Sequence, residues 1–294
     1  MSQEAVPKLG PSFVPSFGPN PFVRRPFRGP LRAVILDWAG TTVDYGSCAP
    51  AMAFVEAFER HGVPISVDEA RGPMGKPKWD HIQAILNLPP VARRWEQVHG
   101  APPGEAEAES LYRDFIPLQV SALADHAALI PGTLEAAQAF RRMGLKIGTT
   151  TGYTREMMDV LVPLAAAQGY HPDSVVHGSS VPAGRPAPWM ALLSAMEMGV
   201  YPMEAIVKVG DTLPDIEEGL NAGMWAVGVA LTGNEIGLQE AVVRQLPPEV
   251  LKKRLEQAYR RLHLAGAHAV VDGIWDVPGA LESIADRLAG GEKP

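Results

Sequence analysis

Four short apolar segments, each rich in β-forming residues, recur along the chain, and amphipathic stretches separate most of them. They span residues 31–36, 145–150, 205–209 and 225–231. This alternation is typical of an α/β fold, in which helices connect the strands of a parallel sheet. We therefore predict a Rossmann-like parallel sheet with a last strand and helix within residues 268–288. Ligands of such sheets bind beyond the carboxyl ends of the strands.

More than a hundred residues separate the first two segments, far more than one crossover helix needs. Helical patterning covers much of this interval, over residues 49–61, 77–87, 90–99 and 105–125. Among polar residues, the first of these stretches carries the apolar residues Met52, Phe54, Val55 and Phe58. These apolar side chains favour a helix that packs inside the insertion, and the alternative is that they form a contact surface between two subunits of a dimer. A second, helical domain is therefore predicted here.

Turn-forming residues flank this insertion on both sides. We predict an inserted α-helical cap domain of residues 47–127 and an α/β core of residues 31–46 and 128–290. The proline-rich residues 1–30 lack both periodicity and the apolar core of a secretion signal. They are expected to form a disordered extension.

The 294-residue chain carries a formal net charge of -7, which argues against a surface that binds nucleic acid. Its single cysteine, Cys48, excludes an intrachain disulfide and a cysteine-based zinc cluster. The sequence contains no uncharged apolar stretch of about 20 residues, the length that crosses a bilayer. We therefore expect a cytoplasmic protein whose partners include neither nucleic acid nor membrane.

Three polar residues directly follow predicted strands: Asp37, Thr151 and Asp211. Because parallel strands end at one edge of a sheet, these side chains should converge. Asp37 opens the sequence Asp-Trp-Ala-Gly-Thr and is the candidate nucleophile. Many phosphoryl-transfer enzymes place a second aspartate two residues further on to protonate the leaving group, where this chain has Ala39. The missing acid is therefore a clue to the leaving group.

Asp215 lies four residues after Asp211, and Pro214 between them suits the first turn of a helix. A hard divalent cation such as Mg²⁺ would relieve the repulsion among these two carboxylates and Asp37. We expect Asp37 and Asp211 to be direct ligands. Asp215 is expected to act directly or through water, and the Ala39 carbonyl to add an oxygen. Taken alone, the Asp211–Asp215 pair would more simply cap the helix.

The hydroxyl of Thr151 and the amides of Gly152 and Tyr153 could hold phosphate oxygens ahead of a helix beginning near Thr154. An ordinary helix cap is the alternative. Arg185 precedes another helical run, and its guanidinium could make a bidentate contact with a phosphoryl group. An isolated arginine there would more simply be a surface cation or part of a structural ion pair.

In this order, the Asp-Trp-Ala-Gly-Thr, Thr-Thr-Gly and Gly-Asp-x-x-x-Asp motifs resemble those of the haloacid dehalogenase-like hydrolase superfamily, with its cap domain inserted after the first motif. The resemblance covers residues 31–275. It implies that Asp37 attacks phosphorus and forms an aspartyl phosphate, which water then hydrolyses. It also implies phosphate contacts from Thr151 and Arg185 and a magnesium site at the carboxylates named above.

Loss of a general acid typically costs about 10² to 10⁴ in rate, so Ala39 favours a leaving group that needs no protonation on oxygen. Carbon that departs as an enamine meets this condition, and an enamine requires an amine. The insertion contains Met-Gly-Lys-Pro-Lys-Trp-Asp-His at residues 74–81. It resembles the branch of the superfamily that cleaves the carbon–phosphorus bond of phosphonoacetaldehyde, giving acetaldehyde and phosphate. In that branch a lysine of the cap domain forms a Schiff base with the aldehyde. Lys78 matches the spacing of that lysine from the Met-Gly pair and from the histidine, and Lys76 is the competing candidate.

Other residues of these motifs are predicted to contact the substrate. His81 lies three residues after Lys78, on the same helical face, and either shuttles protons or packs at the cap–core junction. Tyr153 is expected to orient the aldehyde or water, while Met74 and Gly75 shape the pocket. A lysine with a pKa of about 10.4 is neutral only about once in 2,500 molecules at pH 7. We therefore expect burial to lower the pKa of Lys78. The resemblance also implies a homodimer.

Three other functions remain open. A magnesium-dependent phosphomonoesterase or phosphomutase of the same superfamily fits the metal motif, but Ala39 disfavours it. Hydrolytic dehalogenation at carbon would not need the metal that Asp211 and Asp215 imply. A noncatalytic binding protein would have no need of Asp37 and Arg185.

Overall fold

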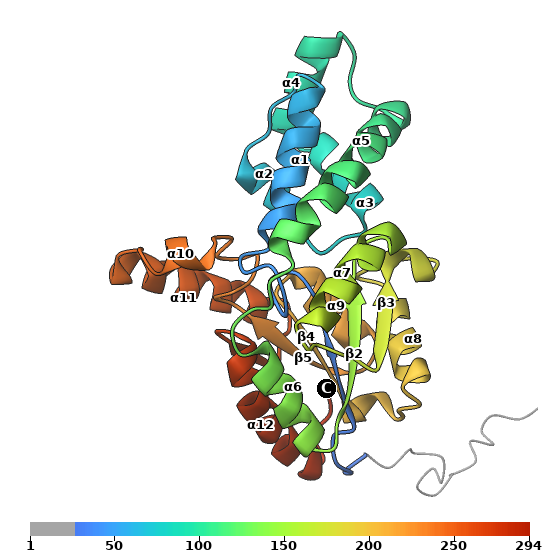
Figure 1. The fold of residues 1–294 in the computed structure, drawn as a ribbon, viewed down its shortest axis with the longest axis vertical. Coiled ribbons are helices and arrows are strands. Elements are labelled where there is room, and N and C mark those ends of the chain that lie inside the picture. Colours follow the sequence, from blue (N-terminus) through green and yellow to red (C-terminus); the bar gives the residue numbers. More distant parts are fainter. Residues whose placement is uncertain (1–26) are drawn as a thin grey trace, which may run out of the picture.

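The computed structural model describes residues 27–294, so most of the extension predicted at residues 1–30 lies outside the described residues (Figure 1). The core is a parallel sheet with the strand order β3-β2-β1-β4-β5-β6. Its strands are β1 Ala33–Leu36, β2 Lys146–Thr151, β3 Ser174–His177, β4 Ile206–Gly210, β5 Trp225–Val229 and β6 Ala269–Val271. Every neighbouring pair is parallel, which confirms the predicted α/β sheet.

Helices pack on both faces of the sheet, which leaves its central strands buried throughout. All residues of β1, β4 and β5 are buried, as expected of a covered parallel sheet. Val34 and Leu36 of β1 belong to one apolar cluster, whereas Ala33 and Ile35 belong to another. The helices of this part are α6 Thr133–Arg142, α7 Arg155–Ala167, α8 Trp189–Glu197, α9 Leu213–Asn221, α10 Glu240–Val243, α11 Pro248–Leu264 and α12 Val277–Ala289. Its 3₁₀ turns are η2 Gly178–Ser180, η3 Met203–Ala205 and η4 Ile274–Asp276.

The carboxyl edge of this sheet gathers the polar residues that follow the strands. β1 lies between β2 and β4, and the Asp37 amide still donates a hydrogen bond to the Val209 carbonyl of β4, at 2.9 Å. Because the strands run in parallel, Asp37, Thr151 and Asp211 all lie at this edge. The structure thus brings together the three residues that the sequence placed after strands.

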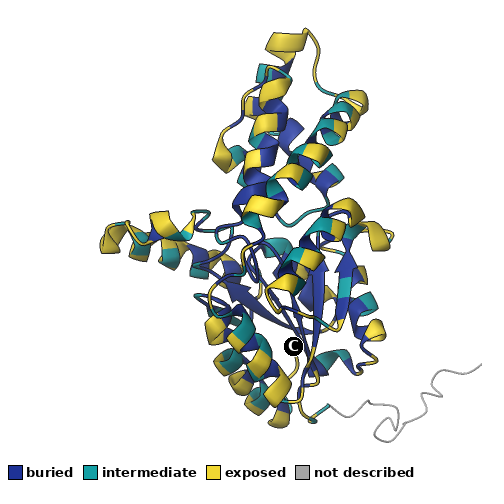
Figure 2. Ribbon diagram, viewed as in Figure 1, coloured by how far each residue is buried: buried dark blue, intermediate teal, exposed yellow. Residues whose placement is uncertain are grey.

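Five helices between residues 48 and 123 form a group beyond this edge (Figure 1). They are α1 Cys48–Arg60, α2 Val67–Arg71, α3 Lys78–Leu86, α4 Pro89–His99 and α5 Glu105–Leu123, followed by the 3₁₀ turn η1 Ala124–His126. Phe54 of α1 stacks on Phe115 of α5, with ring centroids 4.2 Å apart. Phe58 is also buried, whereas Met52 is 54% exposed. Figure 2 shows buried residues on the faces that these helices turn toward one another. The apolar face of α1 therefore packs inside the group, apart from Met52.

The elements that were not expected from the sequence include β3, α2, α10 and α11. β3 has four residues and α2 has five, so neither is long enough to display a clear hydrophobic period. A local signal for α2 was nevertheless present, because Ser66 and Glu69 form a capping box at its start. Among the described residues, no helix is both long and apolar enough to span a membrane.

Polar contacts join the helical group to the core where the chain passes between them. Asp44 Oδ2 accepts a hydrogen bond from the Ala49 amide at the start of α1, at 2.9 Å. Its Oδ1 lies 3.0 Å from Nδ1 of His126, in the returning segment. Arg71 of α2 donates to the side-chain oxygen of Asn234 in the core, at 3.1 Å. Both connecting segments are thus fixed by buried or half-buried polar contacts.

Candidate active site

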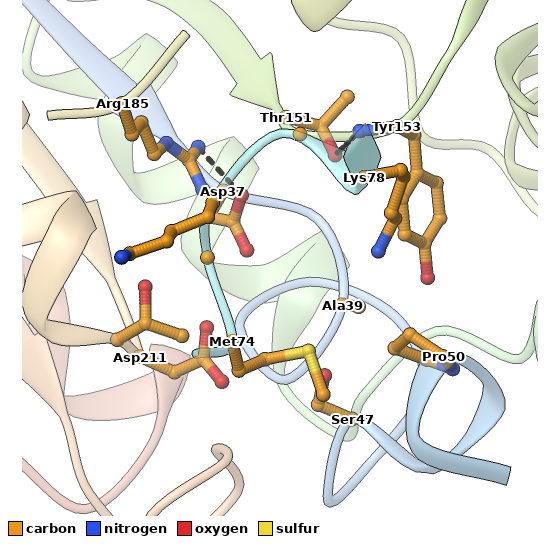
Figure 3. Close-up of a pocket in the computed structure, with 14 residues that line it drawn as sticks. Asp37, Ala39, Ser47, Pro50, Met74, Lys78, Thr151, Tyr153, Arg185 and Asp211 are labelled. Carbon is orange, nitrogen blue, oxygen red and sulfur yellow. Dashed lines mark hydrogen bonds and ion pairs between the residues drawn. The ribbon is translucent and has the colours of Figure 1, made fainter. Parts of the chain in front are cut away.

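A small cavity lies between the carboxyl edge of the sheet and the segment that leads into α3 (Figure 3). Its volume is about 30 Å³, room for little more than a water molecule. The predicted site residues that line it are Asp37, Ala39, Met74, Gly75, Lys78, Thr151, Gly152, Tyr153, Arg185 and Asp211. Its other lining residues are Ser47, Pro50, Lys76 and Thr212. Two predicted site residues, His81 and Asp215, do not line it.

Asp37 lies at the centre of this cavity and contacts Arg185. The Arg185 Nη2 atom donates to Asp37 Oδ1 at 2.7 Å (Figure 3). Burial raises the pKa of Asp37, and the Arg185 guanidinium opposes this effect. A carboxylate nucleophile must be ionised, so the neighbouring cation favours the reactive form.

Asp211 provides a carboxylate oxygen that still lacks a partner. Its Oδ2 accepts a hydrogen bond from the Asn234 amide at 2.7 Å, whereas its Oδ1 is buried without a hydrogen-bond partner among the described residues. Burial, together with repulsion from Asp37 and Asp215, raises the pKa of Asp211 well above its ordinary value. Oxygens of the three carboxylates lie within 4.8 Å of one another. Such an all-oxygen, strongly anionic cluster fits a hard divalent cation.

Asp215 is occupied by other protein groups. Its Oδ1 lies 2.6 Å from Lys208 Nζ and 3.0 Å from Arg185 Nη1, and its Oδ2 accepts from the Thr212 hydroxyl at 2.5 Å. Despite burial, the two cations lower the pKa of Asp215. The structure therefore differs from the direct-ligand alternative of the sequence prediction, because both oxygens already have partners.

Thr151, Gly152 and Tyr153 form the turn that follows β2. The Thr151 hydroxyl oxygen accepts a hydrogen bond from the Tyr153 amide at 3.2 Å. A Cβ atom on Gly152 would lie 2.9 Å from the Lys76 carbonyl oxygen, so glycine permits the segment before α3 to approach the turn. Burial raises the pKa of Tyr153 well above its ordinary value, and its phenol therefore stays protonated at neutral pH.

Lys78 is the first residue of α3, and its side chain is held among aromatic rings. Its Nζ lies 4.9 Å from the ring centroid of Tyr153, 5.5 Å from that of Phe54 and 5.8 Å from that of Phe115. The residue is only 5% exposed. Burial lowers the pKa of Lys78 to about 7, with Asp37 opposing the shift. The predicted depression of this pKa by burial is confirmed.

Lys76 and Lys78 occupy different environments. Lys76 is half-buried at the cavity, and the cation that adds to the depression of the Lys78 pKa is Arg185. Although Lys76 is only two residues from Lys78 in the chain, Arg185 is the cation that contributes, because the fold brings residues distant in sequence to the same cavity.

His81 packs beneath the cavity and does not reach it. Its Nε2 lies 2.8 Å from the Ala70 carbonyl oxygen, and its ring centroid is 3.9 Å from that of Phe54. Burial, reinforced by the positive charge of Lys78, lowers the pKa of His81 to about 3. Of the two predicted alternatives, the structure favours the packed, neutral histidine over a substrate-binding residue.

Two buried charged residues behind the cavity were missed by the sequence analysis. Lys208 of β4 and Glu218 of α9 are both fully buried. Glu218 Oε2 accepts hydrogen bonds from Arg185 Nε at 2.9 Å and from the Thr150 hydroxyl at 3.0 Å. The sequence did contain a signal for them, because Lys208 interrupts an otherwise apolar strand. A cation buried in this way requires a charged or polar partner.

Comparisons with known proteins identify the family to which the chain belongs. The family described as haloacid dehalogenase-like hydrolase matches residues 31–223. A phosphonoacetaldehyde hydrolase of Syntrophobacter fumaroxidans is 52% identical over 274 residues, which cover 93% of this chain and 99% of that protein. A phosphonoacetaldehyde hydrolase of Nitratidesulfovibrio vulgaris is 51% identical over 276 residues, which cover 94% of this chain and 99% of that protein.

A solved structure is similar over nearly the same length. The crystal structure of a phosphonoacetaldehyde hydrolase-like protein from Oleispira antarctica superposes with a TM-score of 0.90 at 42% identity. The match covers 92% of this chain and 98% of that one. The chain therefore belongs to the phosphonoacetaldehyde hydrolases, an enzyme family within the haloacid dehalogenase-like hydrolases.

Proposed function

We propose that this protein hydrolyses the carbon–phosphorus bond of phosphonoacetaldehyde to acetaldehyde and phosphate. The observation that carries the proposal is the shared cavity of Asp37 and Lys78, in which burial lowers the pKa of Lys78 to about 7. The names of the relatives support the same substrate. Ala39 also supports it, because carbon as a leaving group needs no acid at that position.

The first step is imine formation on Lys78. With a pKa of about 7, about half of the Lys78 amines are neutral at pH 7, against about one in 2,500 for an ordinary lysine. The neutral amine attacks the aldehyde carbon, and loss of water leaves a protonated imine next to the carbon that bears phosphorus. The protonated Tyr153 phenol supplies a polar group beside this amine.

The second step transfers the phosphoryl group to Asp37. A carboxylate oxygen of Asp37 attacks phosphorus, the carbon–phosphorus bond breaks, and its electron pair forms an enamine as the imine nitrogen becomes neutral. Arg185 and the Thr151 turn hold the phosphoryl oxygens. When bound, Mg²⁺ would be held by Asp37, Asp211 and the Ala39 carbonyl, with Asp215 acting through water, and would neutralise charge on the carboxylates and the phosphoryl group.

Two hydrolyses then restore the protein. The enamine takes a proton on carbon, and water cleaves the resulting imine to release acetaldehyde and the Lys78 amine. A second water cleaves the aspartyl phosphate and releases phosphate from Asp37. Because the cavity has a volume of about 30 Å³, we propose that residues 47–127 form a cap that moves away from the core to admit substrate. A homodimer and a cytoplasmic location remain predictions.

The proposal is tested by measuring both products. The wild-type protein with Mg²⁺ and phosphonoacetaldehyde should release acetaldehyde and phosphate in equal amounts. Lys78→Met should abolish both products, because the variant has no amine to form the imine. The matched variant Lys76→Met should retain the activity. Magnesium-dependent phosphate release from ordinary phosphate esters that survives in Lys78→Met would instead favour a phosphomonoesterase.

A further inference from the structure

We propose that Glu218 is a positioning residue that fixes the orientation of Arg185 toward the phosphoryl group. This inference rests on the proposed function, in which Arg185 holds phosphoryl oxygens. Glu218 has no surface in the cavity, and its carboxylate is fully buried in α9. A buried carboxylate is costly unless it is paired, and Arg185 is its closest cationic partner.

The guanidinium of Arg185 is contacted by carboxylates at all three nitrogens. Nε donates to Glu218 Oε2 at 2.9 Å, Nη1 lies 3.0 Å from Asp215 Oδ1, and Nη2 donates to Asp37 Oδ1 at 2.7 Å. A guanidinium is a rigid planar fork. Contacts on three sides therefore fix both its position and its plane. Of the three carboxylates, only Asp37 attacks phosphorus in the proposed reaction.

Glu218 is itself held in place, so that it can serve as a fixed anchor. The Thr150 hydroxyl donates to its Oε2 at 3.0 Å, and Lys208 Nζ lies 3.6 Å from the same atom. Glu218 also follows Asp215 by three residues on α9, which places both carboxylates on one face of the helix. The anchor therefore joins α9 to β4 and to the end of β2.

The same contacts link Arg185 to the phosphate-binding turn. Arg185 Nη2 donates to the Thr150 carbonyl oxygen at 2.8 Å and lies 2.9 Å from the Thr150 hydroxyl. Thr150 directly precedes Thr151, which lines the cavity. Glu218 thereby sets the position of Arg185 relative to Thr151, the two groups proposed to hold phosphoryl oxygens.

Without the charge of Glu218, the guanidinium has one fewer anionic partner on its Nε side. Asp37 and Asp215 remain on its other side, so the cation should leave the position in which it is aligned with the phosphoryl group. A displacement of about 1 Å at a catalytic group can cost about a hundredfold in rate. The effect should fall mainly on phosphoryl transfer, since Glu218 is not among the groups that shift the pKa of Lys78.

The test compares Glu218→Gln with Glu217→Gln. Gln keeps the size of the side chain and removes its charge, and Glu217 is the exposed neighbour on the same helix, outside the network. Glu218→Gln should lower kcat about tenfold to a hundredfold and weaken the binding of inorganic phosphate, measured by calorimetry with Mg²⁺. Borohydride trapping of substrate on Lys78 should be unchanged. Glu217→Gln should match the wild type in all three measurements.

An unchanged kcat and phosphate affinity in Glu218→Gln would overturn the inference. So would a loss of kcat that is matched by an equal loss of borohydride trapping, which would indicate general damage to the fold. If Glu218→Gln does not fold, Glu218→Asp decides, because it keeps the charge but withdraws the carboxylate from Arg185 Nε, and it should lower phosphate affinity several-fold. Failure of the wild type to cleave phosphonoacetaldehyde would reject the proposed function, while the phosphate-affinity comparison would still test Glu218.

Discussion

Lys78 shows how a fold changes the chemistry of a single residue. In water its amine would be almost entirely protonated at neutral pH. In this structure the aromatic rings of Phe54, Phe115 and Tyr153 surround it, and they disfavour the charged form because they replace its hydration without offering a counter-charge of equal strength. The attraction of Asp37 opposes this effect and is the smaller of the two.

The first prediction concerns the pH dependence of imine formation. Because only the neutral amine attacks the aldehyde, the rate of borohydride trapping should rise with pH through about 7, the pKa of Lys78, and then level off. The measurement is the initial trapping rate across this range with Lys76→Met as control, which should give the same profile. A rate that continues to rise toward pH 10, as for an ordinary lysine, would contradict the account.

The residues that could be predicted from the sequence are those whose position follows from one strand end. Asp37, Thr151 and Asp211 belong to this class, because the sheet topology alone brings them together. The partners of Asp215 could not be predicted, since they depend on which face of α9 meets Lys208 and Arg185. For His81 two interpretations were open from the sequence, and only its packing against Phe54 distinguishes them.

At the scale of elements, the segment before α3 reaches the core through Gly75. This residue has φ +91°, and a Cβ atom on it would lie 2.3 Å from the Thr212 hydroxyl oxygen. Glycine is required for both reasons, since other residues rarely adopt this φ and any side chain would collide with the start of α9. The close approach brings Met74 and Lys76 to the cavity.

The second prediction separates these two effects of Gly75. Gly75→Ala should lower kcat/KM strongly, because the added methyl group keeps the segment away from Thr212. Gly100→Ala is the matched control: Gly100 has φ +78°, but a Cβ atom there would meet nothing within 4 Å. Both variants carry the backbone penalty of about 1 to 2 kcal/mol, and Gly75→Ala adds the collision with Thr212, so its melting temperature should fall at least as far as that of Gly100→Ala. Equal kcat/KM values in the two variants would show that the contact with Thr212 is unimportant.

The helices α1, α3, α4 and α5 were expected within a few residues of their bounds, because each presents several turns of apolar spacing. Length alone did not decide the outcome, since the four-residue β1 was expected and the 17-residue α11 was not. The short β3 and α2 were also not expected, although α2 supplies Arg71, which contacts Asn234 of the core.

At the scale of the whole molecule, the ion pair of Asp44 and His126 joins the two segments that connect the helical group with the core. Its hydrogen bond raises the pKa of His126. A raised pKa in the folded state means that protonation favours folding, so this stabilisation is complete below the ordinary histidine pKa and is lost as the pH rises through the folded value.

The third prediction follows from this dependence of stability on pH. His126→Gln keeps a neutral hydrogen-bonding group but cannot be protonated. The wild type should therefore melt at a higher temperature than the variant at about pH 5.5, and the difference should shrink at about pH 8.5. The measurement is thermal unfolding of both proteins at the two pH values. A difference that grows with pH would have the wrong sign for an ion pair formed by protonated His126.

The arrangement of the helical group over the sheet could be predicted only as an insertion, because the sequence shows its length and its helices but not their contacts with the core. Those contacts decide the chemistry, since Lys78 comes from the insertion and Asp37 from the sheet. The cavity exists where the two parts meet. The proposed reaction therefore depends on the assembly of this cavity from both parts.

The most direct test of that reaction is to treat the protein with phosphonoacetaldehyde and borohydride and to locate the adduct by peptide mass analysis. The account predicts a reduced adduct on Lys78 and none in Lys78→Met. An adduct on Lys76 would contradict the assignment of the Schiff-base residue. Absence of any adduct, while Mg²⁺-dependent hydrolysis of ordinary phosphate esters proceeds, would contradict cleavage of a carbon–phosphorus bond.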